Sequence, residues 1–115
     1  MQNKHGILES AILSSLWDLE SQGIYTNSVK DVYLLMNKTE ARAYTTIKTV
    51  MDRLYEKNML LRFKQGKKFY YRTTRPKTEI VLNALKEVAQ RYCGGDMAKL
   101  SQILNSHEND RLLNV

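Results

Sequence analysis

The fold of this chain is decided by the stretch from Arg42 to Lys77, which reads RAYTTIKTVMDRLYEKNMLLRFKQGKKFYYRTTRPK. Eleven of the 18 Lys and Arg residues lie in it, against two acidic residues. The stretch therefore carries a net charge of +9, while the rest of the chain carries −3. A positive excess this concentrated, on a segment that is expected to fold, suits a polyanionic partner.

The first half of this stretch has the period of an amphipathic helix. Apolar residues recur at i, i+3, i+4 and i+7, namely at Ile47, Val50, Met51 and Leu54. This spacing predicts one buried face. At about 100° per residue, the opposite face carries in order Thr45, Lys48, Thr49 and Asp52. Short hydroxyl side chains beside one lysine allow a helix to lie close in a nucleic-acid groove. There they can contact phosphates or the edges of the DNA bases.

The second half predicts a β-hairpin, with strands at 60–64 and 69–73 joined by a turn at 65–68. The β-favouring FYY run and the glycine in the turn support this. Strand alternation places on the core side Leu61, Phe63 and the ring of Phe69 or Tyr71. It places on the outer side Arg62, Lys64, Tyr70 and Arg72. A helix followed by a hairpin with a basic tip is typical of the recognition helix and wing of a winged helix-turn-helix.

The same residues carry a family resemblance, through the runs AYTTIKTVMDRLYEKNML and KQGKKFYYR. The matching positions are Ala43, Tyr44, Thr45, Thr46, Ile47, Thr49, Val50, Met51, Arg53, Leu54, Lys57, Leu60, Gly66, Lys67, Phe69 and Tyr71. They resemble the penicillinase-repressor family, which includes the β-lactamase, methicillin-resistance and copper-responsive repressors of bacteria. Asn58 stands where the family usually has Gly, and both residues tolerate the left-handed conformation that ends a helix.

Upstream of the basic stretch, a helix is expected over Ile7–Glu20. It carries two neighbouring apolar stripes, formed by Leu8, Ile12, Leu16 and Leu19 and by Leu13 and Trp17. Two stripes predict burial on two sides, one against the recognition helix and one against the C-terminal helices of a partner chain. An ordinary core position is the alternative for Trp17.

A second upstream helix is expected over Val29–Met36. Ser28 and Asp31 form the pattern of a capping box at its start. This helix is the first of the helix-turn-helix, and it resembles the corresponding helix of the family. Between the two upstream helices, Ile24–Tyr25 is expected to add a short strand to the wing sheet.

The expected DNA contacts follow from the position of each side chain on this framework. Thr45, Lys48 and Thr49 are predicted to face the major groove. Tyr44 and Thr46, at the helix start, are predicted to bond to phosphates; a core-edge aromatic is the alternative for Tyr44. The remaining phosphate candidates are Arg42, Lys67 and Lys68. A merely solvated basic hairpin is the alternative for the last two.

The C-terminal part predicts two helices, the first beginning at Pro76 and ending at Tyr92. Gly94–Gly95 ends it, and Asp96 caps a second helix over Met97–Asn105. The apolar residues expected at a dimer interface are Val81, Ala84, Leu85, Val88, Tyr92, Leu100 and Leu104. A two-helix piece this small cannot bury its apolar face alone, so we expect it to pair with a second copy. The predicted division is a DNA-binding domain at 1–75 and a helical dimerisation region at 76–115.

Composition and motifs argue against other classes of protein. A single cysteine, Cys93, excludes an intrachain disulfide and a cysteine-cluster metal site. It also excludes the Cys-x-Cys pair of the copper-responsive repressors. His5 and His107 have no second metal ligand nearby in sequence. No nucleophile motif or phosphate loop is present, so we expect no catalytic residue, no metal and no cofactor. No apolar run is long enough for a membrane span and no signal peptide is apparent, which predicts a cytoplasmic protein.

The sequence thus predicts an α+β, mostly helical chain with a winged helix-turn-helix and a C-terminal helical dimerisation segment. Its expected partners are double-stranded DNA and a second copy of itself, as a homodimeric repressor on a palindromic operator. A winged-helix module that binds protein or RNA is the alternative. The resemblance implies release of DNA by an inducer pathway, in the β-lactam cases by proteolysis in the dimer region. No residue matching a cleavage site stands out, so the upstream sensor or protease stays unknown.

Overall fold

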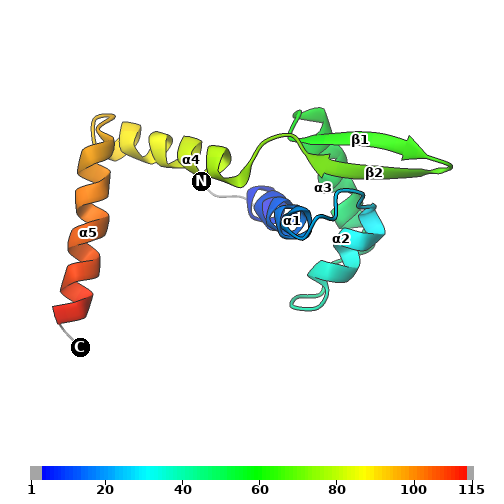
Figure 1. Ribbon diagram of the computed structural model, residues 1–115, viewed down its shortest axis with the longest axis horizontal. Helices are drawn as coiled ribbons and strands as arrows, with labels where there is room; N and C mark the ends of the chain where they lie inside the picture. The colour runs from blue at the N-terminus through cyan, green and yellow to red at the C-terminus, as the bar shows by residue number, and fades with distance from the viewer. Residues whose placement is uncertain (1–3, 114–115) are drawn as a thin grey trace. The chain divides into compact units, whose positions relative to one another are not determined.

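The computed structural model describes residues 4–113 of the chain, with side chains described for residues 6–108. The described part holds helices and one two-stranded antiparallel sheet, which confirms the predicted α+β, mostly helical class (Figure 1). In chain order, the elements are α1 (Lys4–Ser21), α2 (Val29–Met36), α3 (Tyr44–Glu56), β1 (Leu60–Gln65), β2 (Lys68–Thr73), α4 (Lys77–Tyr92) and α5 (Met97–Leu113). They form two compact units that divide between Lys77 and Thr78.

The first unit packs α1, α2 and α3 against the β1–β2 hairpin, around one apolar core (Figure 1). The predicted stripe of α3 is entirely buried, as are Leu8, Ile12, Leu13 and Leu16 of α1 and Val29, Val32 and Met36 of α2. The core residues with almost no exposed surface are Ile12, Leu16, Val32, Ile47, Val50, Met51 and Leu54. Three helices with a hairpin attached to the third form a winged helix-turn-helix, as the sequence predicted.

The start of α2 and the turn after it are fixed by side chains. At the predicted capping box, the Asp31 N–H donates to Ser28 Oγ at 3.2 Å, and the Ser28 N–H donates to Asp31 Oδ2 at 2.8 Å. After α2, the Asn37 amide donates to the Tyr33 carbonyl at 2.7 Å, and its oxygen accepts the Arg42 N–H at 2.9 Å. Asn37 therefore holds together the turn that leads into α3.

The wing has the predicted pairing, and β2 faces as predicted with the Tyr71 ring buried, but β1 has the opposite face assignment. Leu60 is 2% exposed, whereas Leu61, predicted to lie in the core, is 53% exposed. The register pairs Arg62 with Tyr71, and cross-strand partners share a face, so Arg62 lies on the inner side with the buried Tyr71 ring. The predictions for Leu61 and Arg62 were wrong by one residue in phase, because both faces of this hairpin carry apolar side chains.

The loop between α1 and α2 differs from the prediction as well. No strand forms at Ile24–Tyr25; instead Asn27 makes a single β-bridge to Tyr71, whose N–H donates to the Asn27 carbonyl at 2.8 Å. Asn27 is buried, and its amide donates to the Ile24 carbonyl at 3.0 Å. The side-chain bond and the bridge both hold this loop at Asn27.

The end of the wing is tied to α1. The Glu20 carboxylate accepts hydrogen bonds from the Thr73 N–H at 2.8 Å and from the Thr73 hydroxyl at 2.5 Å. The Trp17 indole N–H donates to the Arg75 carbonyl at 3.0 Å. Trp17 is therefore a half-buried residue that fixes the path of the chain as it leaves β2.

The second unit consists of α4 and α5, joined by a tight turn. Gly94 and Gly95 have φ of +59° and +81°, a region that favours glycine. The Asp96 carboxylate then accepts the N–H groups of Ala98 and Lys99 at 2.9 and 3.3 Å, which confirms the predicted cap. Helix α5 runs on to Leu113 rather than ending near Asn105. Within residues 4–113, no helix is both long and apolar enough to cross a membrane.

Candidate nucleic-acid interface

The outward face of α3 carries the three residues predicted to enter the major groove. Thr45, Lys48 and Thr49 are all exposed, on the side of the helix away from its buried stripe. The Thr49 hydroxyl donates to the Thr45 carbonyl at 2.9 Å, so its oxygen remains able to accept. Thr46, in the first turn, is also exposed. Their contacts with DNA remain predictions.

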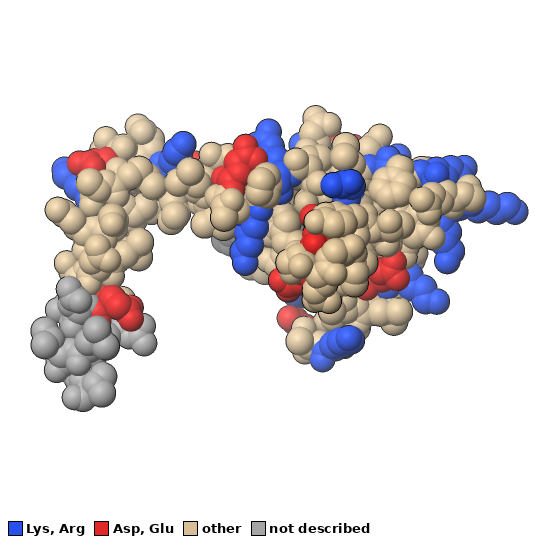
Figure 2. All heavy atoms as spheres, in the orientation of Figure 1, with Lys and Arg blue, Asp and Glu red and all other residues tan. Residues whose placement is uncertain are grey.

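A basic hollow of about 360 Å³ lies between α3 and the wing. Its lining includes four of the predicted DNA-binding residues, which the fold brings together from two elements: Tyr44, Lys48, Lys67 and Lys68. Figure 2 shows Lys and Arg side chains projecting from the end of the hairpin that carries two of them. The hollow thus joins the exposed face of α3 to the tip of the wing.

Two further basic side chains line the same hollow and were missed by the sequence analysis. Lys30 lies in the first turn of α2 and is exposed. The first helix of a helix-turn-helix crosses the DNA backbone, so a base at its start was a signal that sequence reasoning could have used. Arg62 was assigned to the outer side of the wing by the wrong strand phase. The remaining residues lining the hollow are Ser28, Val29, Asp52, Phe69 and Tyr71.

Asp52 is the acidic centre of the hollow. Its Oδ2 atom lies 3.0 Å from Lys48 Nζ, and its Oδ1 atom lies 3.5 Å from Arg62 Nη1. The Tyr71 hydroxyl donates to Oδ1 at 3.3 Å. One carboxylate therefore connects α3 with both strands of the wing and neutralises part of the basic surface.

Arg62 is also held by aromatic rings. Its guanidinium carbon lies 4.0 Å from the centre of the Tyr55 ring and 4.5 Å from the centre of the Phe69 ring. Cations over aromatic faces at such distances are attracted by the ring quadrupole. Arg62 is thus fixed from three sides, whereas the Lys48 ammonium is held by its ion pair with Asp52.

The network shifts the ionisation of two of its members. The hydrogen bond and charge of Asp52 raise the pKa of the Lys48 ammonium above its ordinary value. Burial raises the pKa of the Tyr71 phenol, against the neighbouring Arg62 guanidinium, which lowers it. Both of these groups are therefore protonated near neutral pH.

Tyr44 is placed for both roles predicted for it, a phosphate contact and an aromatic at the edge of the core. Its ring packs edge-to-face on Tyr33 of α2, with ring centres 5.6 Å apart. The residue is nevertheless 43% exposed and lines the hollow. Tyr44 therefore braces α3 against α2 while remaining accessible at the start of α3, where backbone N–H groups favour an anion.

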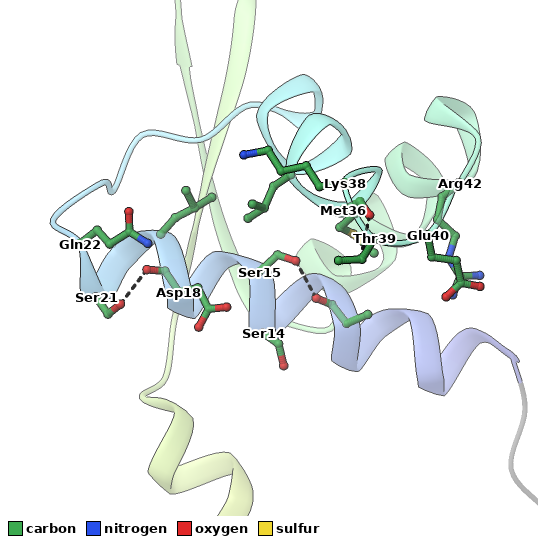
Figure 3. A pocket seen from close by; sticks show the side chains of 13 residues that line it. Ser14, Ser15, Asp18, Ser21, Gln22, Met36, Lys38, Thr39, Glu40 and Arg42 are labelled. Carbon is green, nitrogen blue, oxygen red and sulfur yellow. Dashed lines mark hydrogen bonds and ion pairs between the residues drawn. The ribbon is translucent and has the colours of Figure 1, made fainter.

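Arg42 lies apart from the other predicted residues. It lines a groove between α1 and the α2–α3 turn, where Figure 3 shows its side chain beside Glu40. Its Nη2 atom lies 3.3 Å from the Glu40 carboxylate, and its Nε atom is buried with no hydrogen-bond partner. A phosphate contact by Arg42 would have to compete with Glu40, so Arg42 has less support than Lys48 or the wing lysines.

The groove that holds Arg42 does not assemble a binding site. In Figure 3, the Ser15, Ser21 and Thr39 hydroxyls are bonded to backbone carbonyls of their own segments, at 3.0, 2.7 and 3.2 Å. Ser14 and Asp18 point away from α2. Within the side chains that the structure describes, no group of three or more His, Cys, Asp or Glu is placed to hold a metal ion.

An exposed polar helix face, a basic wing and a capped helix-turn-helix together define a winged-helix DNA-binding protein. Comparison with known proteins specifies the class further. The family model for the penicillinase repressor matches residues 5–111, so the chain belongs to the penicillinase-repressor family. A penicillinase repressor from Staphylococcus aureus is 26% identical over 117 residues, which cover 99% of this chain and 87% of that protein. Membership places the chain among DNA-binding transcriptional repressors.

Proposed function

We propose that the protein represses transcription as a homodimer bound to a palindromic operator. The α3 helices of two copies enter successive major grooves, roughly 34–36 Å apart, and each wing contacts the flanking backbone. Thr45, Lys48 and Thr49 face base edges, while Tyr44, Thr46, Lys67 and Lys68 bond to phosphates. Repression follows because the bound dimer covers promoter DNA.

The proposal that the protein binds DNA rests mainly on one observation, the grouping of basic side chains around one hollow. The basic side chains come from α2, α3 and the wing hairpin, and they all line the space between α3 and the wing. They are Lys30, Lys48, Arg62, Lys67 and Lys68. A duplex lying along α3 meets this space next to its phosphates. The electrostatic attraction supplies affinity, and the exposed face of α3 supplies the reading surface.

The dimer is supported by the incomplete core of the second unit. Among the side chains described there, those classed as buried are Ala89 and Cys93. Five of the seven predicted interface residues are exposed, with Tyr92 at 79% and Leu104 at 57%; Leu85 and Leu100 are half-buried. Apolar surface of this extent on two helices favours burial against a second copy.

Selection of bound duplexes from a random pool tests the operator proposal. The selected sequences should share two inverted half-sites, with centres about one helical turn apart or a multiple of it. A pool that yields no common sequence would contradict the proposal. It would favour the alternative of a winged-helix module that binds protein or RNA.

Sedimentation of Val88→Asp tests the dimer. Val88 is 41% exposed on the apolar side of α4, and an unpaired carboxylate buried there would oppose association. The variant should sediment as a monomer at concentrations where the wild type is dimeric. The matched control is Lys86→Asp, two positions earlier on the same helix and therefore on its other side; it should remain dimeric. Equal behaviour of the two variants would remove this face from the interface.

A further inference from the structure

Asp52 is an acidic side chain in the middle of a surface that has to approach phosphates. It stands on the outward face of α3, one turn after Lys48, and its side chain is 31% exposed. A carboxylate at this place repels the DNA backbone. Electrostatic attraction to DNA cannot explain an acidic side chain in the basic hollow, so Asp52 needs another physical reason.

Stability of the fold gives only part of the reason, because the Tyr71 hydroxyl that donates to Asp52 Oδ1 at 3.3 Å could donate equally to an uncharged amide oxygen. Arg62 already lies over two aromatic rings, so it does not depend on Asp52 alone for its position. The Lys48 ammonium is largely exposed, and ion pairs between exposed groups contribute little to folding. The acid nevertheless engages two bases that face the hollow, at 3.0 and 3.5 Å.

The geometry suggests an effect on DNA binding instead. An ammonium has three donors, so Lys48 can stay bonded to Asp52 and still donate to a base-edge acceptor. Held in this way, the Lys48 side chain loses less conformational freedom when a matching base is present. Its charge is partly neutralised, however, which weakens its attraction to phosphates that are the same in every sequence.

We propose that Asp52 is a specificity-determining residue, which competes with DNA phosphates for Lys48 and Arg62 and so limits sequence-independent binding. It acts through these two bases and is therefore a positioning residue rather than a contact residue. The proposal rests on the DNA binding argued above and deepens it, because it states how the interface distinguishes an operator from other duplexes.

The test compares Asp52→Asn with the wild type on two duplexes, one taken from the selection and one of random sequence. Binding is measured between about 50 and 200 mM salt. Affinity for the random duplex should rise about two- to fivefold, the range of an exposed ion pair. The salt dependence on that duplex should steepen by about one unit, because losing the Asp52 charge leaves one more net positive charge at Lys48 and Arg62 available to phosphates. Affinity for the selected duplex should rise less, so the ratio of the two affinities should fall.

The matched control is Glu56→Gln, which removes one negative charge a turn further along the same helix, where the side chain is exposed. It should leave both the ratio and the salt dependence unchanged. In a Lys48→Gln background, Asp52→Asn should have a smaller effect than in the wild type, because one of its two partners is absent.

Three results would overturn the proposal: an Asp52→Asn variant that behaves like Glu56→Gln, one that weakens binding to both duplexes equally, or one in which specificity rises. Folding is checked by circular dichroism, and Asp52→Ser repeats the test if the Asn variant is not fully folded. Loss of folding in both would show that Asp52 serves the fold instead. Failure of the wild type to bind any duplex would contradict the DNA-binding function itself, a different outcome from failure of the Asp52 variants alone.

Discussion

At the scale of single residues, the candidate interface combines exposed side chains that are predicted to contact DNA with side chains that the fold holds in place. Lys48 projects from α3 and reaches only as far as its partner Asp52 in the free protein. Tyr71 is the opposite kind of residue, since its ring is buried in the core while its hydroxyl reaches the same carboxylate. A change at Lys48 therefore affects the charge of the hollow, whereas a change at Tyr71 affects core packing and the hydrogen bond to Asp52.

Replacing Lys48 by Ala should weaken binding to the selected duplex by about 1–3 kcal/mol if Lys48 donates to a base edge. The loss should be concentrated at one base position of the operator. Binding assays on duplexes mutated at each position check this. An equal loss on every duplex would assign Lys48 to a phosphate instead.

The raised pKa of Tyr71 predicts that the stability of the fold depends on pH in the alkaline range. Burial raises its pKa in the folded state, so the contribution of the neutral phenol is complete below the unfolded pKa of about 10. This contribution is lost as the pH rises through the folded pKa. The difference in unfolding free energy between wild type and Tyr71→Phe should therefore shrink above about pH 10. Urea titrations at several pH values measure it, and a constant difference would contradict the assignment.

At the scale of elements, the sequence predicted those features that short-range rules control. Helix α2 has the predicted bounds because the Ser28–Asp31 capping box sets its start. Asn58 has a φ of +62° at the end of α3, as its replacement of a family glycine implied. Helix α5 is longer than predicted because, after Asp96, no Gly or Pro interrupts the chain.

Long-range packing decided what the sequence analysis could not. Leu60 and Leu61 are both apolar, as are the rings of Tyr70 and Tyr71, so alternation alone could not tell which face of the wing would be buried. The bridge from Asn27 to Tyr71 and the packing of α3 select the face that carries Leu60. The same choice of face brings Arg62 into the hollow, which is why this part of the candidate site was missed.

The left-handed residue at the end of α3 gives a stability prediction. Asn58→Ala should lower the unfolding free energy by about 1 kcal/mol, because a Cβ-bearing residue without a polar side chain is strained at positive φ. Asn58→Gly is the matched control and should be at least as stable as the wild type. Thermal or urea unfolding compares the three proteins. Equal stability of the Ala and Gly variants would mean that the backbone relaxes at this position.

The wing gives a prediction about salt. Changing Lys67 and Lys68 together to Ala should reduce the salt dependence of DNA binding by about two units if both neutralise phosphates. The control is Lys99→Ala with Lys86→Ala, which removes the same charge from the second unit. A salt dependence unchanged by the wing substitutions would remove the hairpin tip from the DNA contacts.

At the scale of the whole molecule, the two units differ in how complete they are. The first has its own apolar core and contains all the predicted DNA-binding residues. Among the side chains described up to residue 108, the second exposes most of the large apolar ones. The proposed function therefore uses the first unit to bind DNA and the second unit to pair with a second copy.

A fragment that ends at Lys77 should therefore fold and still bind a half-site. It should bind the complete two-half-site duplex about 100-fold or more weakly than the full chain, because the gain from linking two copies is absent. It should also lose its preference for half-site spacing. Gel-shift titrations with altered spacings measure both effects. A fragment with full affinity would show that pairing does not depend on the second unit.

The hydrogen bond between Trp17 and the Arg75 carbonyl has a spectroscopic consequence. Trp17 is the sole tryptophan of the chain, and it is bonded two residues before α4 begins. Its indole emission therefore reports, without any added label, whether this segment is attached to α1. Detachment would move the emission maximum to longer wavelength, so a fluorimeter can follow any event that frees the end of the wing.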